Sequence, residues 1–289
     1  MQPLVYKHIS EVINDNHYDI FLFDIWGVII EAGQFRASVA HNITAMIECG
    51  DKVFFVTNAP RTAAFLQVTL QACGIPATKE MIVSSGEVAL HMLQQSAELL
   101  GIPTPLIYHL GRANNNLIDN CSVATTRNIY EANLVLLTLF CEENEEEILA
   151  ETEDILAIIA QRKILTLCAN PDHGLMQADT YRYCAGYFAE KIKQQGGQVM
   201  YTGKPYPEIY QTIFHQQPTI AKNRILMIGD TFDTDIVGAR TAGIDSALVL
   251  TGNARACYDF FSPLEEQLLQ ITAAAMEKQA LPNFCIQLG

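Results

Sequence analysis

The stretch Phe21-Leu22-Phe23-Asp24-Ile25-Trp26-Gly27-Val28-Ile29-Ile30 decides the fold. Residues 20–23 form a short apolar run without a polar interruption, which is typical of a strand buried on both faces of a parallel sheet. Asp24 follows at the carboxyl end of this predicted strand, where open α/β sheets bind their ligands, and Gly27 allows a sharp turn. An aspartate in such a place more commonly caps a turn or a helix, so the role of Asp24 depends on the rest of the chain.

The rest of the chain alternates between short apolar runs and helical patterns. We predict further strands at residues 52–56, 81–83, 225–228 and 247–250, and helices at residues 3–14, 35–49, 61–73, 85–100, 208–216, 235–242 and 264–278. Gly50 stands where the second of these helices needs a C-cap. The alternation predicts an α/β fold with βαβ units around a doubly wound, Rossmann-like parallel sheet.

The middle of the chain is a second α/β region. Strands are expected at residues 106–111, 134–140 and 164–168, an amphipathic helix within the Glu-rich run 142–154, and a helix at 181–195. We place an inserted α/β domain at residues 98–198. Residues 1–97 and 199–289 would then form the two parts of the core domain, the second part carrying the C-terminal helix.

Composition narrows the class of protein. Of the 289 residues, 49% are hydrophobic and 17% are charged, which predicts a well-packed core. The formal charge of −14 argues against nucleic acid or an anionic membrane as a partner, although a local cation still permits a small phosphorylated substrate. The eight cysteines form no CxxC pair, residues 1–16 lack the apolar segment of a signal peptide, and no run has transmembrane length. We therefore expect a reduced, cytoplasmic, soluble protein.

Four polar points stand at the ends of apolar runs, and a doubly wound sheet brings such ends to one edge. They are Asp24, Thr57-Asn58, Lys204 and the group of Asp230, Asp233 and Asp235. Two carboxylates with water between them can hold Mg2+, a hard cation that takes oxygen ligands. A lysine and a hydroxyl beside them supply positive charge and a hydrogen bond to phosphoryl oxygens. A carboxylate in that setting can serve as a nucleophile and form an aspartyl-phosphate that water hydrolyses.

These motifs resemble those of a known family. Hydrophobic-Asp-x-x-Gly-Val ends at residue 28, hydrophobic-Thr-Asn at 58, Gly-Lys-Pro at 205 and Ile-Gly-Asp-x-x-x-Thr-Asp-Ile at 236. In this order they resemble the four motifs of the haloacid dehalogenase (HAD) superfamily. The likeness is greatest to its class IIA phosphatases, which act on nucleotides, sugar phosphates, glycerol phosphate and pyridoxal phosphate. Ala-Asn-Pro-Asp at residues 169–172 looks like the signature of that class's inserted cap domain.

The resemblance implies a role for each matched residue of the reaction centre. Asp24 would be the nucleophile and a ligand of Mg2+, and Lys204 would bridge the nucleophile and the phosphate. Asp230 would bind Mg2+ directly, and Asp235 would hold the metal's waters or Lys204. The backbone carbonyl of Trp26 would be a further metal ligand.

A second group would bind the substrate, which the resemblance implies to be a small phosphorylated metabolite. Thr57 and the backbone N–H of Asn58 would bind the phosphoryl group. Asn170 and Asp172 would shape the substrate pocket from the cap, although taken alone this segment also fits a plain turn. Asp233 has no matched role and is expected to be a solvated loop residue. Caps of this class often pair, which leaves a homodimer open.

The pattern breaks at Trp26. HAD phosphatases carry there a second aspartate, which protonates the leaving oxygen and then activates water. An indole cannot exchange that proton, since its N–H is only a donor, and general acid-base help is typically worth about 10^2–10^4 in rate. We therefore expect an Mg2+-dependent phosphomonoesterase that turns over ordinary alkyl phosphates poorly.

Two alternatives stay open because of this substitution. The first is a protein that binds a phosphorylated ligand on a HAD scaffold with little turnover. The second is a hydrolase like the haloacid dehalogenases, which carry an aromatic tyrosine at this place and need no Mg2+. The intact Gly229-Asp230 to Asp235 motif argues against the second alternative, because displacement at carbon has no use for a metal there.

Overall fold

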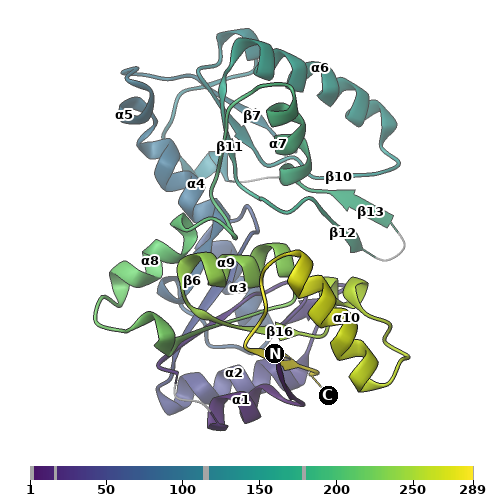
Figure 1. Ribbon diagram of the computed structural model, residues 1–289. Coiled ribbons are helices and arrows are strands. Elements are labelled where there is room, and N and C mark those ends of the chain that lie inside the picture. Colours follow the sequence, from purple (N-terminus) through teal and green to yellow (C-terminus); the bar gives the residue numbers. More distant parts are fainter. Residues whose placement is uncertain (1–2, 16–17, 113–116, 178–179, 289) are drawn as a thin grey trace. The chain divides into compact units, whose positions relative to one another are not determined.

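The computed structural model describes residues 3–15, 18–112, 117–177 and 180–288 (Figure 1). The chain folds into two compact units. The core unit consists of Met1–Thr57, Ala63–Val83 and Lys204–Gly289, and the inserted unit of Asn58–Thr62 and Ser84–Gly203. Each unit carries its own parallel sheet with helices, so the predicted α/β class with a parallel core sheet and an inserted second α/β region is confirmed. The domain bounds of 98 and 198 stay a prediction, beside an inserted unit that also takes in residues 84–97.

The core unit is built on a seven-stranded sheet. Its order is β1 (Leu4–Tyr6), β17 (Phe284–Ile286), β16 (Asp245–Val249), β15 (Ile225–Gly229), β2 (Ile20–Phe23), β5 (Lys52–Thr57) and β6 (Ile82–Ser84). From β1 to β5, every neighbouring pair is parallel. Every residue of the central strands β2 and β15 is buried, as expected for strands covered on both faces. A short hairpin, β3 (Ile30–Glu31) and β4 (Gln34–Phe35), follows the loop after β2.

Helices cover both faces of the core sheet. They are α1 (Ile9–Asp15), α2 (Ala37–Cys49), α3 (Ala63–Ala72), α8 (Glu208–Gln216), α9 (Val237–Ala242) and α10 (Leu264–Glu277), with a π-helical turn at Phe232–Ile236 and 3-10 turns at Lys79–Met81, Lys222–Arg224 and Gly252–Cys257. The crossovers through α2 and α9 run in opposite directions along the sheet, and right-handed crossovers then place these helices on opposite faces. Figure 1 shows α1 and α2 together on one side and α9 on the other. Gly50, in the left-handed region at φ +91°, ends α2 as predicted.

The inserted unit has a five-stranded parallel sheet. Its order is β14 (Val199–Tyr201), β11 (Leu165–Cys168), β9 (Leu134–Leu137), β7 (Ile107–Leu110) and β8 (Thr125–Thr126). A three-stranded antiparallel sheet joins β10 (Cys141–Glu142), β13 (Thr180–Tyr183) and β12 (Gly174–Gln177). The helices are α4 (Ser85–Gln94), α5 (Ser96–Leu100), α6 (Glu146–Arg162) and α7 (Ala185–Gln194), with 3-10 turns at Ile118–Asn120 and Ile129–Glu131.

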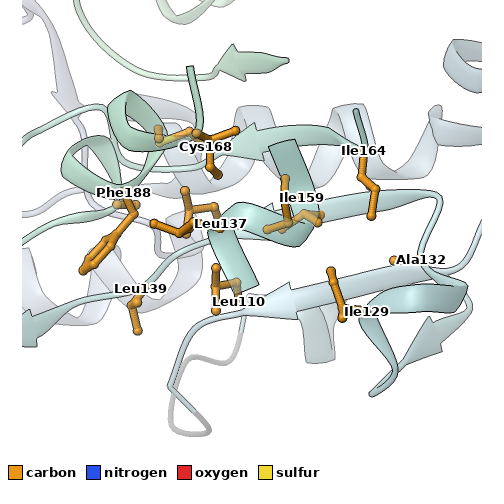
Figure 2. Close-up of a cluster of buried hydrophobic side chains, with 14 of the residues drawn as sticks. Leu110, Ile129, Ala132, Leu137, Leu139, Ile159, Ile164, Cys168 and Phe188 are labelled. Carbon is orange, nitrogen blue, oxygen red and sulfur yellow. The ribbon is translucent and has the colours of Figure 1, made fainter. Parts of the chain in front are cut away.

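The inserted unit has a hydrophobic core of its own. Figure 2 shows side chains of the sheet, Leu110 and Leu137, gathered with Ile159 of α6 and Phe188 of α7. All four are buried. The amphipathic pattern of the Glu-rich segment is confirmed, because α6 buries Leu156 and Ile159 on the face that packs into this core.

Two sequence predictions of local structure were wrong, and a third strand was not predicted. The expected helix 3–14 begins as edge strand β1, and the expected helix 181–195 begins as strand β13. For the chain after residue 253 a helix at 264–278 was predicted and no strand, yet β17 is placed in the sheet between β1 and β16. Each missed strand is only three or four residues long. β1 and β17 pair with strands remote in sequence, and β13 pairs with the neighbouring β12 and with the more distant β10, so pairing rather than local pattern decides them.

The structure bears on two further expectations. In the ranges given above, we find no helix with both the length and the apolar character needed to cross a bilayer. All eight cysteines are free thiols. Cys141, Cys168, Cys184 and Cys285 are buried, where cysteine packs as a small apolar residue.

Candidate active site

Adjacent strands bring Asp24 and Asp230 to the same edge of the core sheet. β2 and β15 pair in parallel with Phe23 opposite Ile228, and the N–H of Asp24 donates to the carbonyl of Ile228 at 2.9 Å. Asp24 directly follows β2 and Asp230 directly follows β15. Both carboxylates are buried, at 7% and 2% exposure. The carboxyl ends of two central strands therefore present two acidic groups side by side, as the sequence predicted.

Lys204 connects this edge to a third carboxylate. Its Nζ donates to Asp24 Oδ1 at 2.7 Å, to Asp235 Oδ1 at 2.6 Å and to the carbonyl of Val56 at 3.0 Å. These three bonds use all three donors of an ammonium group. Because Lys204 is buried at 2% exposure, its charge is stabilised by the two carboxylates rather than by water. Lys204 therefore holds Asp24 and Asp235 in a fixed relation.

The three aspartates form a candidate metal site. Asp24, Asp230 and Asp235 each offer one oxygen, and these oxygens lie within 4.8 Å of one another. Three buried carboxylates against one ammonium leave two formal negative charges, which a divalent cation would balance. A set of oxygen donors without nitrogen or sulfur suits a hard cation such as Mg2+. The donor set thus fits the cation that the sequence predicted.

Burial, and after it the neighbouring charges, shift the pKa values of the cluster. Burial raises the pKa of Asp24 well above its ordinary value, although the positive charge of Lys204 opposes the rise. Burial and the neighbouring Asp235 raise the pKa of Asp230 to about 7. Burial alone would lower the pKa of Lys204, but Asp235 and Asp24 raise it above its usual value. Lys204 therefore stays protonated. The raised pKa values of Asp24 and Asp230 show that their carboxylates would be stabilised by a further positive charge.

Two glycines and a backbone N–H enclose Asp230. A Cβ on Gly27 would lie 2.3 Å from Asp230 Oδ2, and one on Gly252 would lie 2.0 Å from the same oxygen. Both glycines have positive φ, at +91° and +50°, a region that side chains disfavour. The N–H of Asn253 donates to Asp230 Oδ2 at 2.6 Å. The backbone at Gly27 and the backbone at Gly252 and Asn253 therefore pack closely against the Asp230 carboxylate and restrict its position.

The remaining residues predicted for the site are divided between the core unit and the inserted unit. Thr57 ends β5, the strand next to β2, and is buried. Asn58 belongs to the inserted unit, where its Nδ2 donates to Asp172 Oδ1 at 2.8 Å. The N–H of Asp172 donates to Asn170 Oδ1 at 3.0 Å. Asp233 is exposed, as expected, but it lies in the π-helical turn Phe232–Ile236 rather than in a loop, and its carboxylate pairs with Lys278. The predicted residues thus form two clusters, a charged one in the core unit and a polar one in the inserted unit.

Trp26, the only tryptophan of the chain, is 44% exposed. Its backbone forms a bridge with Ile30, and the N–H of Gly27 donates to the carbonyl of Ile30 at 2.7 Å. The preceding Ile25 is fully buried. The loop after Asp24 is therefore anchored on both sides of Trp26, which is itself a little less than half exposed.

Sequence reasoning missed several contacts of the core cluster. It did not find the carbonyl of Val56 on Lys204, the N–H of Asn253 on Asp230, or a bond from Thr251 Oγ1 to the carbonyl of Gly27 at 2.7 Å. Each of these contacts uses a backbone carbonyl or N–H group. Nearly every residue carries both groups, so only the three-dimensional contact shows their role.

Comparison with known proteins agrees with this geometry. Residues 21–115 match the family described as haloacid dehalogenase-like hydrolase, and residues 201–266 match the family described as HAD-hydrolase-like. The first match contains Asp24 and the second contains Lys204, Asp230 and Asp235. The segments that form the carboxylate cluster are therefore similar to HAD-like hydrolases.

The similar proteins match different fractions of the chain. A haloacid dehalogenase-like hydrolase from Brucella suis 1330 superposes with a TM-score of 0.77 at 24% identity, covering 97% of this chain and 98% of that one. A possible sugar phosphatase of the HAD superfamily from Cytophaga hutchinsonii ATCC 33406 gives 0.75 at 22% identity, covering 98% of each chain. Mouse chronophin is 30% identical over 92 residues, which are 32% of this chain and 28% of chronophin. The two structures share the fold, whereas the match to chronophin spans less than a third of its length.

Proposed function

We propose that the protein is an Mg2+-dependent phosphomonoesterase that acts on a small phosphorylated metabolite through an aspartyl-phosphate on Asp24. One observation carries this proposal: Lys204 Nζ bridges Asp24 and Asp235 at 2.7 and 2.6 Å within a buried group that also contains Asp230. A buried nucleophile beside a fixed cation and two further carboxylates is suited to phosphoryl transfer, which depends on positioning and charge stabilisation.

The first chemical step belongs to Asp24. An oxygen of its carboxylate attacks phosphorus, and the bond between phosphorus and the leaving oxygen breaks with its electron pair on that oxygen. Lys204 holds the carboxylate in place through Oδ1, which leaves Oδ2 for the attack. Water then attacks the phosphorus of the aspartyl-phosphate, which releases inorganic phosphate and restores the carboxylate. Thr57, and the backbone N–H of Asn58, would donate hydrogen bonds to the phosphoryl oxygens.

Asp24, Asp230 and the backbone carbonyl of Trp26 would hold Mg2+, with Asp235 holding the metal's waters or Lys204. The ion would neutralise charge so that an anionic phosphate can approach a carboxylate. The buried negative charge of the aspartates supports this assignment. Asn170 and Asp172 are proposed to contact the rest of the substrate, and a homodimer stays a prediction.

Trp26 determines which substrates react well. The leaving oxygen must acquire a proton, and the indole cannot supply one. We therefore propose that good substrates have leaving groups that are stable as anions or carry their own acidic proton. Aryl phosphates meet the first condition, and ordinary alkyl phosphates meet neither.

The test is release of phosphate from p-nitrophenyl phosphate with Mg2+ and with EDTA. We expect activity that requires Mg2+ and is lost in Asp24→Asn, because an amide cannot serve as the nucleophile. Asp233→Asn, which changes an exposed carboxylate outside the cluster, is the matched control and should retain full activity. Undiminished activity in Asp24→Asn would refute the assignment.

Trp26 also favours a second candidate function, a binding protein with little turnover. That candidate predicts saturable, Mg2+-dependent binding of a phosphorylated metabolite without phosphate release across a broad panel. A dehalogenase-like reaction predicts instead that halide release from 2-haloacids persists in EDTA. One panel of phosphorylated metabolites and haloacids, with and without Mg2+, separates the three.

A further inference from the structure

We propose that Glu31 is a positioning residue for Asp230. Its carboxylate anchors the loop Thr251–Asn253, and the main chain of that loop holds Asp230 in the orientation required of a metal ligand. The inference rests on the proposed function only in taking Asp230 as a ligand of Mg2+. Neither the motifs nor the resemblance assigns any role to Glu31.

A chain of contacts leads from Glu31 to Asp230. Glu31 Oε1 accepts a hydrogen bond from the N–H of Gly252 at 2.9 Å. The next N–H in the chain, that of Asn253, donates to Asp230 Oδ2 at 2.6 Å. Because the two N–H groups are successive, fixing the first limits the freedom of the second. The backbone of Gly252 thus links the contact with Glu31 to the contact with Asp230.

The loop needs such an anchor because of its glycine. Gly252 has φ +50°, and a Cβ there would lie 2.0 Å from Asp230 Oδ2. Only glycine permits this approach, and glycine is also the residue with the greatest backbone freedom. The bond from Thr251 Oγ1 to the carbonyl of Gly27, at 2.7 Å, fixes one side of Gly252. The bond from Gly252 N–H to Glu31 fixes the glycine itself.

Glu31 is held in turn by Arg36. The guanidinium of Arg36 forms an ion pair with Glu31 Oε2, while Oε1 remains the acceptor for Gly252. The side chains are only 24% and 27% exposed, so the pair is shielded from water. Glu31 belongs to β3 and Arg36 lies directly after β4. The hairpin β3–β4 therefore binds, through Glu31, the segment Thr251–Asn253 that contacts Asp230.

A purely structural role of the ion pair would give a different pattern of variants. Glu31→Gln loses the negative charge that pairs with Arg36 but keeps an oxygen acceptor for the N–H of Gly252. Glu31→Met has a similar length and loses both. Arg36→Met removes the ion pair and leaves the bond between Glu31 and Gly252. If the acceptor is what matters, Glu31→Met alone is strongly affected.

The experiment measures the affinity of the metal-free protein for Mg2+ alone by isothermal titration calorimetry, together with Tm in EDTA. We expect Glu31→Met to raise the Kd for Mg2+ about 10–100-fold, the range found when outer partners of metal ligands are removed. We expect Glu31→Gln and Arg36→Met to raise it less than about threefold. Asp233→Ala, which removes an exposed ion pair three residues from Asp230, should leave the Kd unchanged.

Turnover of p-nitrophenyl phosphate supplies a second readout. Glu31→Met should raise the Mg2+ concentration for half-maximal rate, while kcat at saturating Mg2+ stays within about twofold of the parent value. The inference is overturned if Glu31→Met binds Mg2+ like the parent, if Glu31→Gln loses as much affinity as Glu31→Met, if the parent protein does not bind Mg2+, or if Glu31→Met is unfolded in EDTA. Failure of the proposed function looks different: the parent would bind Mg2+, and the variants would keep their order of affinity, without any phosphate release.

Discussion

The two polar clusters of the molecule differ in charge and in what holds them. In the core unit, Lys204 contacts two buried carboxylates, and a third lies beside them. In the inserted unit, Asn58, Asn170 and Asp172 are linked by hydrogen bonds that involve a side-chain amide or a backbone N–H. Removing one partner of a buried ion pair leaves an uncompensated charge, whereas removing one amide bond costs far less. We therefore propose that covalent chemistry belongs to the first cluster and binding to the second.

Removing the ammonium of Lys204 is expected to have the largest effect. In Lys204→Met, Asp24 and Asp235 lose their shared cation, so we expect stability in EDTA to fall by about 3–5 kcal/mol. Turnover of p-nitrophenyl phosphate should fall by on the order of 10^3-fold, because the nucleophile loses its fixed position. Urea unfolding and initial rates measure the two effects.

Lys278→Met is the matched control for Lys204→Met. It removes the exposed partner of Asp233 and should change stability by less than about 1 kcal/mol. Equal losses of stability in the two variants would show that the buried ion pairs of Lys204 contribute no more than the exposed ion pair of Lys278.

Supplying the missing proton donor is expected to have the next largest effect. Trp26→Asp places a carboxyl two residues after Asp24 at a position that is 44% exposed, so the new group need not be buried. We expect turnover of an alkyl phosphate to rise by about 10^2-fold, in line with the usual worth of general acid catalysis. The rate on p-nitrophenyl phosphate should change little, because that leaving group needs no proton.

Trp26→Asn separates the proton from the change of shape. It has nearly the same volume as Trp26→Asp but cannot act as an acid. If both variants raised turnover of the alkyl phosphate equally, the open space rather than the carboxyl would be the cause.

The stability of the metal-free protein should depend on pH in a direction set by the core cluster. Burial raises the pKa of Asp24, and burial with Asp235 raises that of Asp230 to about 7, whereas unfolded aspartates titrate at about 3.9. The folded protein therefore binds more protons than the unfolded chain between these values. Its free energy of unfolding should fall as pH rises from about 4 to about 7, by at most about 1.4 kcal/mol per pH unit for each group.

Calorimetric scans in EDTA at pH 5 and pH 8 measure this dependence. Saturating Mg2+ should remove most of the loss at pH 8, because it binds the folded site and replaces the missing positive charge. Asp230→Asn should weaken the dependence on pH. Greater stability at pH 8 than at pH 5 in EDTA would contradict the proposed electrostatics.

The two clusters also differ in how many of their contacts the sequence alone could predict. Asp24 and Asp230 were predictable because the carboxyl ends of parallel strands meet at one edge, whatever the loops between them do. Lys204 follows β14, a strand of the other sheet, so only the resemblance of its Gly-Lys-Pro motif implied its place beside Asp24. Glu31 could not be predicted, because its partner is a backbone N–H 221 residues away, and any residue at position 252 has one except proline. Strand β17 was missed for a related reason, since three residues pair with strands that only the folded sheet places beside them.

Weakening the polar cluster of the inserted unit is expected to have the smallest effect. Asn58→Ala removes the bond from Nδ2 to Asp172 Oδ1, measured at 2.8 Å, and should cost about 1 kcal/mol of stability. If this cluster binds substrate rather than taking part in the covalent step, KM should rise several-fold while kcat stays within about twofold. Asp172→Asn keeps the acceptor oxygen and should resemble the parent protein in stability. A thousandfold fall in kcat for Asn58→Ala, with KM unchanged, would instead assign the covalent step to both clusters and remove the distinction between them.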